Sequence, residues 1–249
     1  MLIETRAIVL HRSAYNDRYQ IVHLYTESHG RLGVLQPLRR SRRSGATSLA
    51  MPILAEIELV GELRAGRQLL TLREFRLYRP NQQIQIQPSK CMQGMFISEL
   101  LYRVLSLDAP DEGMYRYLSE SLHILDVIER GVANFYLCFT YHLLYHLAIE
   151  PTIESRLAHR GSWFDLREAQ FTTAPKQSSE AIPPGFLQAL LSFSRIHYGN
   201  MHRYRYSREE RALIVDYMLA YYRLHLPPFP QLRSLEVLRS TSRQQLSAS

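Results

Sequence analysis

Hydrophobic and polar residues follow two different periods along the chain, and the period changes near residue 80. Up to that point, short runs of β-branched, aromatic and aliphatic residues are separated by turn residues such as Tyr15-Asn16-Asp17 and His29-Gly30. The runs predict five β-strands, at Ile3–Leu10, Tyr19–Tyr25, Leu32–Leu38, Ile53–Val60 and Gln68–Tyr78. Five strands within about eighty residues favour a small closed barrel.

After the polar stretch Pro80–Pro88, apolar residues recur every three to four positions, which is the helical period. One helix is expected around Ile97–Leu105, a second after Glu112-Gly113, and a third at Asn134–Ile149 that is apolar nearly all round. Further helices are predicted at Phe186–Tyr198 and, behind a capping box formed by Ser207 and Glu210, at Arg208–Leu226. Residues 152–182 look irregular apart from a small hairpin at 163–166 and 170–172.

We therefore predict a multi-domain α+β protein: a five-stranded oligonucleotide-binding (OB) barrel at residues 1–79, then a helical domain at residues 80–238. An SH3-like barrel fits the strand count almost as well. Leu235–Leu238 is a short apolar clip, and residues 239–249 are expected to be a disordered tail.

Positive charge is concentrated in the first third of the chain. The formal net charge is +7, and residues 1–79 hold 13 arginines against 7 acidic residues, a net charge of +6. Four of these arginines stand close together between the third and fourth predicted strands, at Arg39, Arg40, Arg42 and Arg43, with no acidic residue from Arg31 to Ala55. We call these four the arginine-rich segment. Guanidinium groups crowded in this way suit the phosphates of a nucleic acid, although a solvated basic loop is an equally common interpretation.

We therefore predict a nucleic-acid interface on the N-terminal domain. Its candidate residues are the arginine-rich segment and Arg31, with Arg12, Arg64 and Arg67 on neighbouring loops as weaker candidates. Tyr15, Tyr19 and Tyr25 have the ring type that stacks on bases. Because residues alternate between the two faces of a strand, some of these rings must be core, so they are not assigned to the interface.

Three patterns that resemble catalytic or metal sites are incomplete. Gly61–Gln68 has the glycine spacing of a phosphate-binding P-loop, but Arg67 and Gln68 stand where that motif needs Lys and Ser or Thr, and a hairpin loop is the better interpretation. His142 and His146 are one helical turn apart, but partly buried, hydrogen-bonded histidines are the expected alternative to a metal site. The two cysteines, Cys91 and Cys138, have the surroundings of buried thiols in a reducing compartment.

The N-terminus, MLIETRAIVLHRSAYNDRYQIVHLYTESHGRLGVL, resembles that of the bacterial RecO recombination-mediator family. The similarity includes the A-I-V-L strand at Ala7–Leu10, the turn at Tyr15–Asp17 and the basic segment behind the third strand, then FDL at Phe164–Leu166, YYRLHLP at Tyr221–Pro227 and SLEVL at Ser234–Leu238.

The resemblance implies an N-terminal OB-fold, a helical domain and a non-enzymatic role in recombinational DNA repair in the bacterial cytoplasm. It implies binding to single- and double-stranded DNA, annealing of complementary strands, contact with RecR and with the acidic tail of single-stranded-DNA-binding protein, and help in loading RecA. Many members carry a four-cysteine zinc module, but the segment 161–173 of this chain has no cysteine. We expect no metal and no cofactor, and any remnant of the module must be held by packing of Trp163, Phe164 and Phe171.

For the acidic tail, the resemblance points to the helical domain, where Arg103 and Arg130 are the candidate partner-binding residues. Two other classes of function stay open. An OB-type RNA-binding protein would use the same barrel and charge, and a nuclease could assemble an active site from scattered acidic residues. No catalytic residue is predicted, and no apolar run approaches the length of a transmembrane helix.

Overall fold

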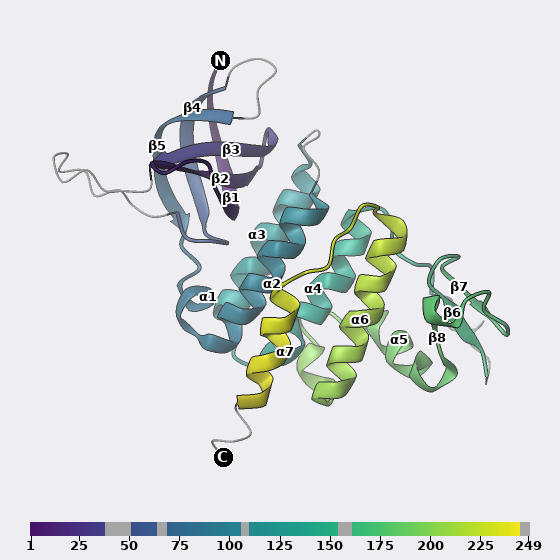
Figure 1. The fold of residues 1–249 in the computed structure, drawn as a ribbon. Helices are drawn as coiled ribbons and strands as arrows, with labels where there is room; N and C mark the ends of the chain where they lie inside the picture. The colour runs from purple at the N-terminus through teal and green to yellow at the C-terminus, as the bar shows by residue number, and fades with distance from the viewer. Residues whose placement is uncertain (38–50, 64–68, 106–109, 154–160, 245–249) are drawn as a thin grey trace. The chain divides into compact units, whose positions relative to one another are not determined.

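The computed structural model describes residues 1–37, 51–63, 69–105, 110–153 and 161–244. They form two compact units, Met1–Val127 (unit 1) and Ile128–Ser249 (unit 2). The fold is α+β, with a five-stranded β-barrel followed by a helical region, as the sequence predicts (Figure 1).

The barrel of unit 1 consists of β1 (Leu2–Ala14), β2 (Tyr19–Thr26), β3 (Gly30–Pro37), β4 (Glu56–Leu63) and β5 (Leu69–Arg79). It closes in the order β1-β2-β3-β5-β4, and β3 and β5 are its one parallel pair among the described strands. This order is that of the OB-fold and decides against the SH3-like alternative. The interior is filled by alternate residues of each strand, among them Ile3, Ala7, Val9, Val22, Leu24, Leu32, Val34, Ile57, Leu59 and Leu70.

Three helices complete unit 1: α1 (Gln82–Ile86), α2 (Pro88–Val104) and α3 (Glu112–Val127). The polar stretch Pro80–Pro88 thus contains the short helix α1. Part of the outer barrel surface is covered by α2 and α3. Ser98 of α2 donates a hydrogen bond to the carbonyl of Leu10, and Tyr115 of α3 stacks on Tyr25 with ring centroids 6.5 Å apart.

A buried carboxylate of the barrel forms polar contacts with α3. Glu56 of β4, only 3% exposed, accepts hydrogen bonds from the hydroxyls of Tyr115 (2.7 Å) and Ser119 (2.9 Å). Arg79 of β5 lies 3.7 Å from the same carboxylate and donates to the Ser119 hydroxyl at 3.1 Å. Burial, and then the bond to Glu56, raises the pKa of Tyr115. These contacts join the barrel to α3 within one unit.

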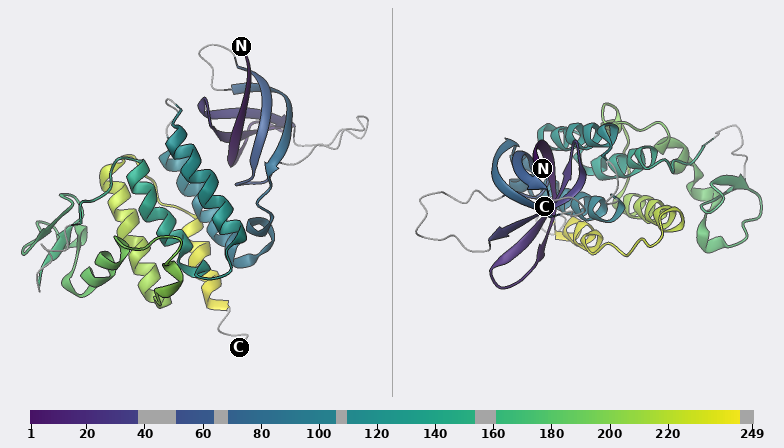
Figure 2. Two further views of the ribbon diagram at one scale, coloured as in Figure 1. Left: turned by 180° about the vertical axis from the view of Figure 1, so that it is seen from behind. Right: turned by 90° about the horizontal axis from the view of Figure 1, so that it is seen from above.

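Unit 2 is built around α4 (Val132–His146), which is buried along most of its length, and α6 (Arg208–His225). The two helices run side by side (Figures 1 and 2), and the hydroxyl of the fully buried Tyr222 donates to the carbonyl of Thr140 at 2.9 Å. The predicted capping box is present, since Ser207 and Glu210 exchange hydrogen bonds at the start of α6. The predicted helix at 186–198 is shorter: it ends at Phe193 as α5 (Leu187–Phe193).

The predicted hairpin forms from β6 (Trp163–Asp165) and β7 (Gln170–Thr172), and β8 (Ala181–Ile182) adds a third strand that the sequence did not reveal. Phe164 is 1% exposed and meets Phe171 edge to face at 5.2 Å, as expected for a module held by aromatic packing. The last helix, α7 (Ser234–Gln244), contains the apolar clip and continues through residues 239–244. The helix thus extends into residues 239–244, which we had assigned to the tail.

Candidate nucleic-acid interface

The arginine-rich segment lies outside the described residues, as do Arg64 and Arg67. Their flanks are described. The arginine-rich segment leaves the barrel at Pro37, the last residue of β3, and the chain resumes at the buried Met51 before β4. Arg64 and Arg67 lie between the antiparallel strands β4 and β5, as a hairpin loop requires. In the sequence, the arginine-rich segment therefore falls between β3 and β4, and Arg64 and Arg67 fall between β4 and β5. The connection between the fourth and fifth strands is one of those with which OB-folds bind oligonucleotides.

Arg12 is half-buried on β1, and its guanidinium donates a hydrogen bond to the carbonyl of Met51. Burial lowers its pKa, although an arginine stays charged in a protein. Because Met51 is the first described residue after the arginine-rich segment, Arg12 anchors the point where that segment rejoins the barrel. Its position favours a supporting role over a direct phosphate contact.

Arg31, which we predicted to bind nucleic acid, is occupied inside the protein. One of its terminal nitrogens donates to the carbonyls of Tyr102 (3.0 Å) and Leu105 (3.1 Å) at the end of α2, and the guanidinium lies 4.1 Å from the centre of the Tyr102 ring. A cation at these carbonyls is stabilised by the negative end of the helix dipole. Burial lowers the pKa of Arg31. The structure therefore gives Arg31 a capping role on α2.

Exposure separates the three candidate tyrosines. Tyr15 is 58% exposed and Tyr19 37% exposed, both at the tip of the β1–β2 hairpin, where the Asn16 side chain accepts hydrogen bonds from the backbone of Arg18 and Tyr19. Tyr25 is buried against Tyr115, and burial raises its pKa to about 12. Tyr15 and Tyr19 can reach a ligand, and Tyr25 cannot.

The outer surface of β4 and its neighbours carries arginines that are already paired with acidic residues. Glu58 of β4 forms ion pairs with Arg6 of β1 and Arg76 of β5, and Glu62 of β4 pairs with Arg73. Glu56 pairs with Arg79, as described above. Such pairs compensate the charge locally, so this surface offers little free positive charge to phosphates.

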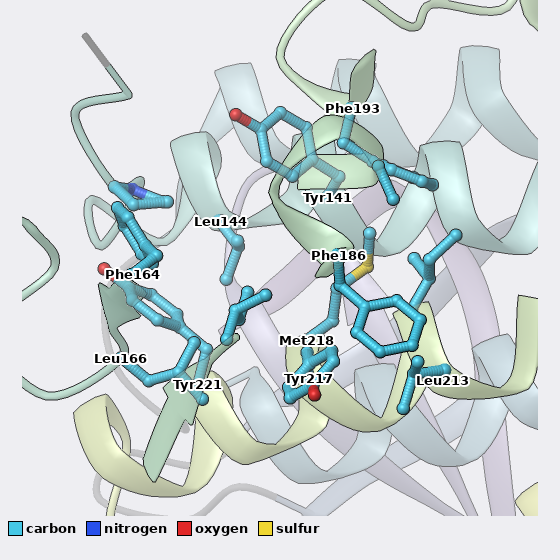
Figure 3. A pocket seen from close by; sticks show the side chains of 14 residues that line it. Tyr141, Leu144, Phe164, Leu166, Phe186, Phe193, Leu213, Tyr217, Met218 and Tyr221 are labelled. Carbon is cyan, nitrogen blue, oxygen red and sulfur yellow. The ribbon is translucent and has the colours of Figure 1, made fainter. Parts of the chain in front are cut away.

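Unit 2 contains an apolar cavity (Figure 3). The cavity lies between α4, α5, α6 and the hairpin, and its lining includes Tyr141, Phe164, Phe186, Phe193, Tyr217 and Tyr221. Burial and the nearby carboxylate of Glu150 raise the pKa of both Tyr141 and Tyr221. The apolar, aromatic lining is of the kind that packs against an aromatic ring.

The tentative partner-binding arginines fall in different units. Arg103 is an exposed residue of α2 in unit 1, and Arg130 is an exposed residue just before α4 in unit 2. The structure therefore does not group the two as one site, and each is a separate candidate.

The suspected metal and thiol sites have ordinary structural explanations. His142 Nε2 donates to the carbonyl of Ile196 at 2.7 Å, as expected of a partly buried, satisfied histidine. Cys138 is buried, and burial raises the pKa of its thiol to about 12, whereas Cys91 is only partly buried. Within the described ranges, no group of three or more His, Cys, Asp or Glu side chains is arranged to hold a metal ion. No helix in the same ranges is long and apolar enough to cross a membrane.

Comparison with known proteins agrees with this architecture. Residues 1–81 match the family model described as Recombination protein O N terminal, and residues 87–236 match Recombination protein O C terminal. The chain is 35% identical to the DNA repair protein RecO of Porphyromonas gingivalis W83 over 240 residues, which covers 96% of this chain and 98% of the relative. It is 36% identical to the protein of the same name from Bacteroides fragilis, with the same coverage. The protein of that name from Christiangramia forsetii is 26% identical over 239 residues, 96% of this chain and 98% of the relative.

Proposed function

Since the chain belongs to the RecO family, whose members act in DNA repair and recombination, we propose that it works as a recombination mediator that binds DNA through loops of its barrel. In this proposal it binds single- and double-stranded DNA in the bacterial cytoplasm and anneals complementary strands. With RecR it helps to load RecA onto strands coated by single-stranded-DNA-binding protein. It acts by binding and not by catalysis.

One observation carries the assignment of DNA to the loops. Arg6 of β1 and three arginines of β5 have glutamate partners on β4, whereas the arginine-rich segment stands in a stretch without acidic residues. Counter-ion release depends on cations that are free to neutralise phosphates. The exposed Tyr15 and Tyr19 add rings on which bases can stack, a contact worth about 1–3 kcal/mol per base.

Two double variants of equal charge test this assignment. Arg42→Ala with Arg43→Ala removes two arginines of the arginine-rich segment, and Arg73→Ala with Arg76→Ala removes two paired arginines of β5. At about 0.7 per phosphate, the first should flatten the dependence of log affinity for single-stranded DNA on log salt by up to about 1.4, and the second should leave it nearly unchanged. Equal effects of the two variants would mean that net charge, and not this segment, determines binding.

A strand-annealing assay tests the mediator role. The wild-type chain should speed annealing of complementary strands, both bare and coated with single-stranded-DNA-binding protein, and the change of all four residues Arg39, Arg40, Arg42 and Arg43 to Ala should abolish this acceleration. Two readouts separate the competing functions. Preference for matched RNA strands would favour the RNA-binding alternative, and DNA cleavage with magnesium or manganese would favour a nuclease.

We also propose that the helical part of the chain binds the acidic tail of single-stranded-DNA-binding protein. The apolar cavity of unit 2 suits an aromatic ring, but Glu150 beside it disfavours acidic residues, so the cation for the tail must be sought separately. Arg130→Ala and Arg103→Ala in the full chain should be compared for binding of a labelled tail peptide. If neither weakens binding, both assignments are wrong.

A further inference from the structure

Tyr102, in the last turn of α2, is surrounded by basic side chains from three barrel strands. The ring centroid of His11 (β1) lies 4.4 Å from that of Tyr102, and the centroid of His23 (β2) lies 5.0 Å from it. The guanidinium carbons of Arg31 (β3) and Arg103 (α2) lie 4.1 and 5.5 Å from the ring centre. His11 and His23 are paired across β1 and β2, and their rings stack at 6.0 Å. We call these five residues the Tyr102 cluster.

The cluster has little negative charge to balance it. Burial lowers the pKa of His11, and the charges of Arg103 and Arg31 lower it further, while Glu99 of α2 opposes them. Burial, Arg31 and His11 lower the pKa of His23 to about 4. Neither arginine of the cluster forms an ion pair within the described parts of the chain. This contrasts with the ion-paired arginines on β1 and β5. Basic groups held together with little opposing charge favour an anionic ligand.

The cluster is also placed where a nucleic-acid strand would run. His11 and His23 belong to the same β1–β2 hairpin that exposes Tyr15 and Tyr19 at its tip, and the strand that carries Arg31 leads directly into the arginine-rich segment. The β2–β3 face is a surface on which OB-folds hold single strands. Both imidazole rings and Tyr102 are partly exposed, and Arg103 is exposed.

We propose that His11, His23, Tyr102 and Arg103 form an anion site that receives one phosphate group of a bound single strand, and that His11 takes up a proton when the phosphate enters. The inference rests on the proposed DNA binding and adds to it a contact outside the arginine-rich segment. Arg31 stays on the carbonyls of α2 and holds the ring of Tyr102 in place. His23 stays neutral and keeps its 2.9 Å hydrogen bond with the hydroxyl of Ser13.

The sign of the pH dependence follows from the charges. In the free protein the lowered pKa keeps His11 neutral at neutral pH. A phosphate beside the ring favours the imidazolium and raises its pKa, so the complex holds more protons than the free protein. Affinity for DNA therefore rises as pH falls between the bound and the free pKa of His11. The limit is about tenfold per pH unit for one proton.

The test compares binding of the full chain to a labelled single-stranded oligonucleotide at about pH 6 and about pH 8 at constant salt. The wild type should bind about tenfold more tightly at the lower pH, and His11→Gln should lose most of this difference. His123→Gln, which changes an exposed histidine of α3, is the matched control and should behave as the wild type. Calorimetry in two buffers of different ionisation enthalpy should show proton uptake by the wild type and its absence in His11→Gln.

Arg103→Ala gives a second test that changes an exposed side chain and does not threaten folding. It should flatten the salt dependence by about 0.7. It should also raise the pKa of His11 in the free protein, measured by NMR, because Arg103 lowers it. Two results would overturn the anion site alone. One is that His11→Gln binds DNA with the pH dependence of the wild type. The other is that Arg103→Ala no longer binds the acidic tail peptide but binds DNA as the wild type does. A wild-type chain that binds no DNA at either pH would overturn the proposed function as well.

Discussion

Replacing Tyr115 by Phe removes one hydroxyl from α3 and leaves a buried carboxylate on β4 without one of its donors. In the native protein, the Tyr115 hydroxyl donates to Glu56 at 2.7 Å, and the carboxylate is 3% exposed, so water cannot take the place of the lost hydroxyl. The aromatic contact with Tyr25 remains, because Phe keeps the ring. The substitution therefore tests the hydrogen bond alone.

A hydrogen bond to a charged, buried group contributes about 1.5–3 kcal/mol. Ser119 and Arg79 still contact the other oxygen of Glu56, which places the expected loss toward the lower end of that range. A loss of about 1.4 kcal/mol corresponds to a tenfold change in an opening equilibrium, so amide exchange through opening of unit 1 should become about ten- to a hundredfold faster.

Hydrogen exchange followed by mass spectrometry gives the measurement for peptides of β4 and α3. The only tryptophan, Trp163, lies on β6 in unit 2, so its fluorescence reports on the unit that does not contain the changed hydrogen bond. Tyr145→Phe, which removes a hydroxyl from a residue 65% exposed on α4, is the control and should alter neither readout. Exchange that is unchanged in β4 and α3 of Tyr115→Phe would refute the reasoning, and so would an equal increase throughout unit 2.

Other consequences of the structure can be checked in the same way. Stability should fall as pH rises above about 10, because burial raises the pKa of Tyr25 and of Tyr136 to about 12. The unfolded chain ionises first, and the loss in a pH titration of denaturant unfolding should approach about 1.4 kcal/mol per tyrosine and pH unit. Gly61→Ala should lower the thermal midpoint, because a Cβ would lie 2.8 Å from the Leu70 side chain and must displace it. Phe164→Ala should cost about 3–5 kcal/mol in the unfolding of unit 2 followed by circular dichroism. Metal analysis of the purified chain should find no stoichiometric zinc, and zinc lost together with stability on chelation would contradict this.

The periodic parts of the fold could be predicted from the sequence. The pattern of strand-forming residues and turns locates all five barrel strands to within about four residues, and Ser207 with Glu210 marks the start of α6. Elements that depend on distant partners could not be predicted. Strand β8 has only two residues, which are too few to show an alternating pattern, and it forms because it pairs with Phe164 and Asp165 of β6. Helix α5 ends at Phe193, although helical sequence continues beyond it.

In the candidate site too, local features could be predicted from the sequence, and features that depend on distant residues could not. The charge excess of residues 1–79 and the position of the arginine-rich segment are local properties that the sequence displays. The role of Arg31 is not local, because its partners Tyr102 and Leu105 lie more than 70 residues away. Because side chains alternate along a strand, Arg31 must point away from the barrel core that contains Leu32. Only the packing of α2 shows that the outer face of the barrel contacts a helix at Arg31. Exposed and buried tyrosines could not be separated for the same reason.

Because α2 and α3 pack on the barrel, DNA binding by the barrel and partner binding by the helical part must be tested in the full chain. The family model of the N-terminal part ends at residue 81, close to the predicted domain boundary, whereas the compact unit that contains the barrel extends to Val127. A fragment that ends at residue 79 would lack α2 and α3 and would therefore expose Tyr25, Leu10 and the carboxylate of Glu56 to solvent. If such a fragment failed to bind DNA, the cause would be lost packing and not a lost interface. Substitutions in the full chain avoid this ambiguity, because the arginine-rich segment, the Tyr102 cluster and Arg130 can each be changed while the buried contacts between the barrel and α3 stay intact.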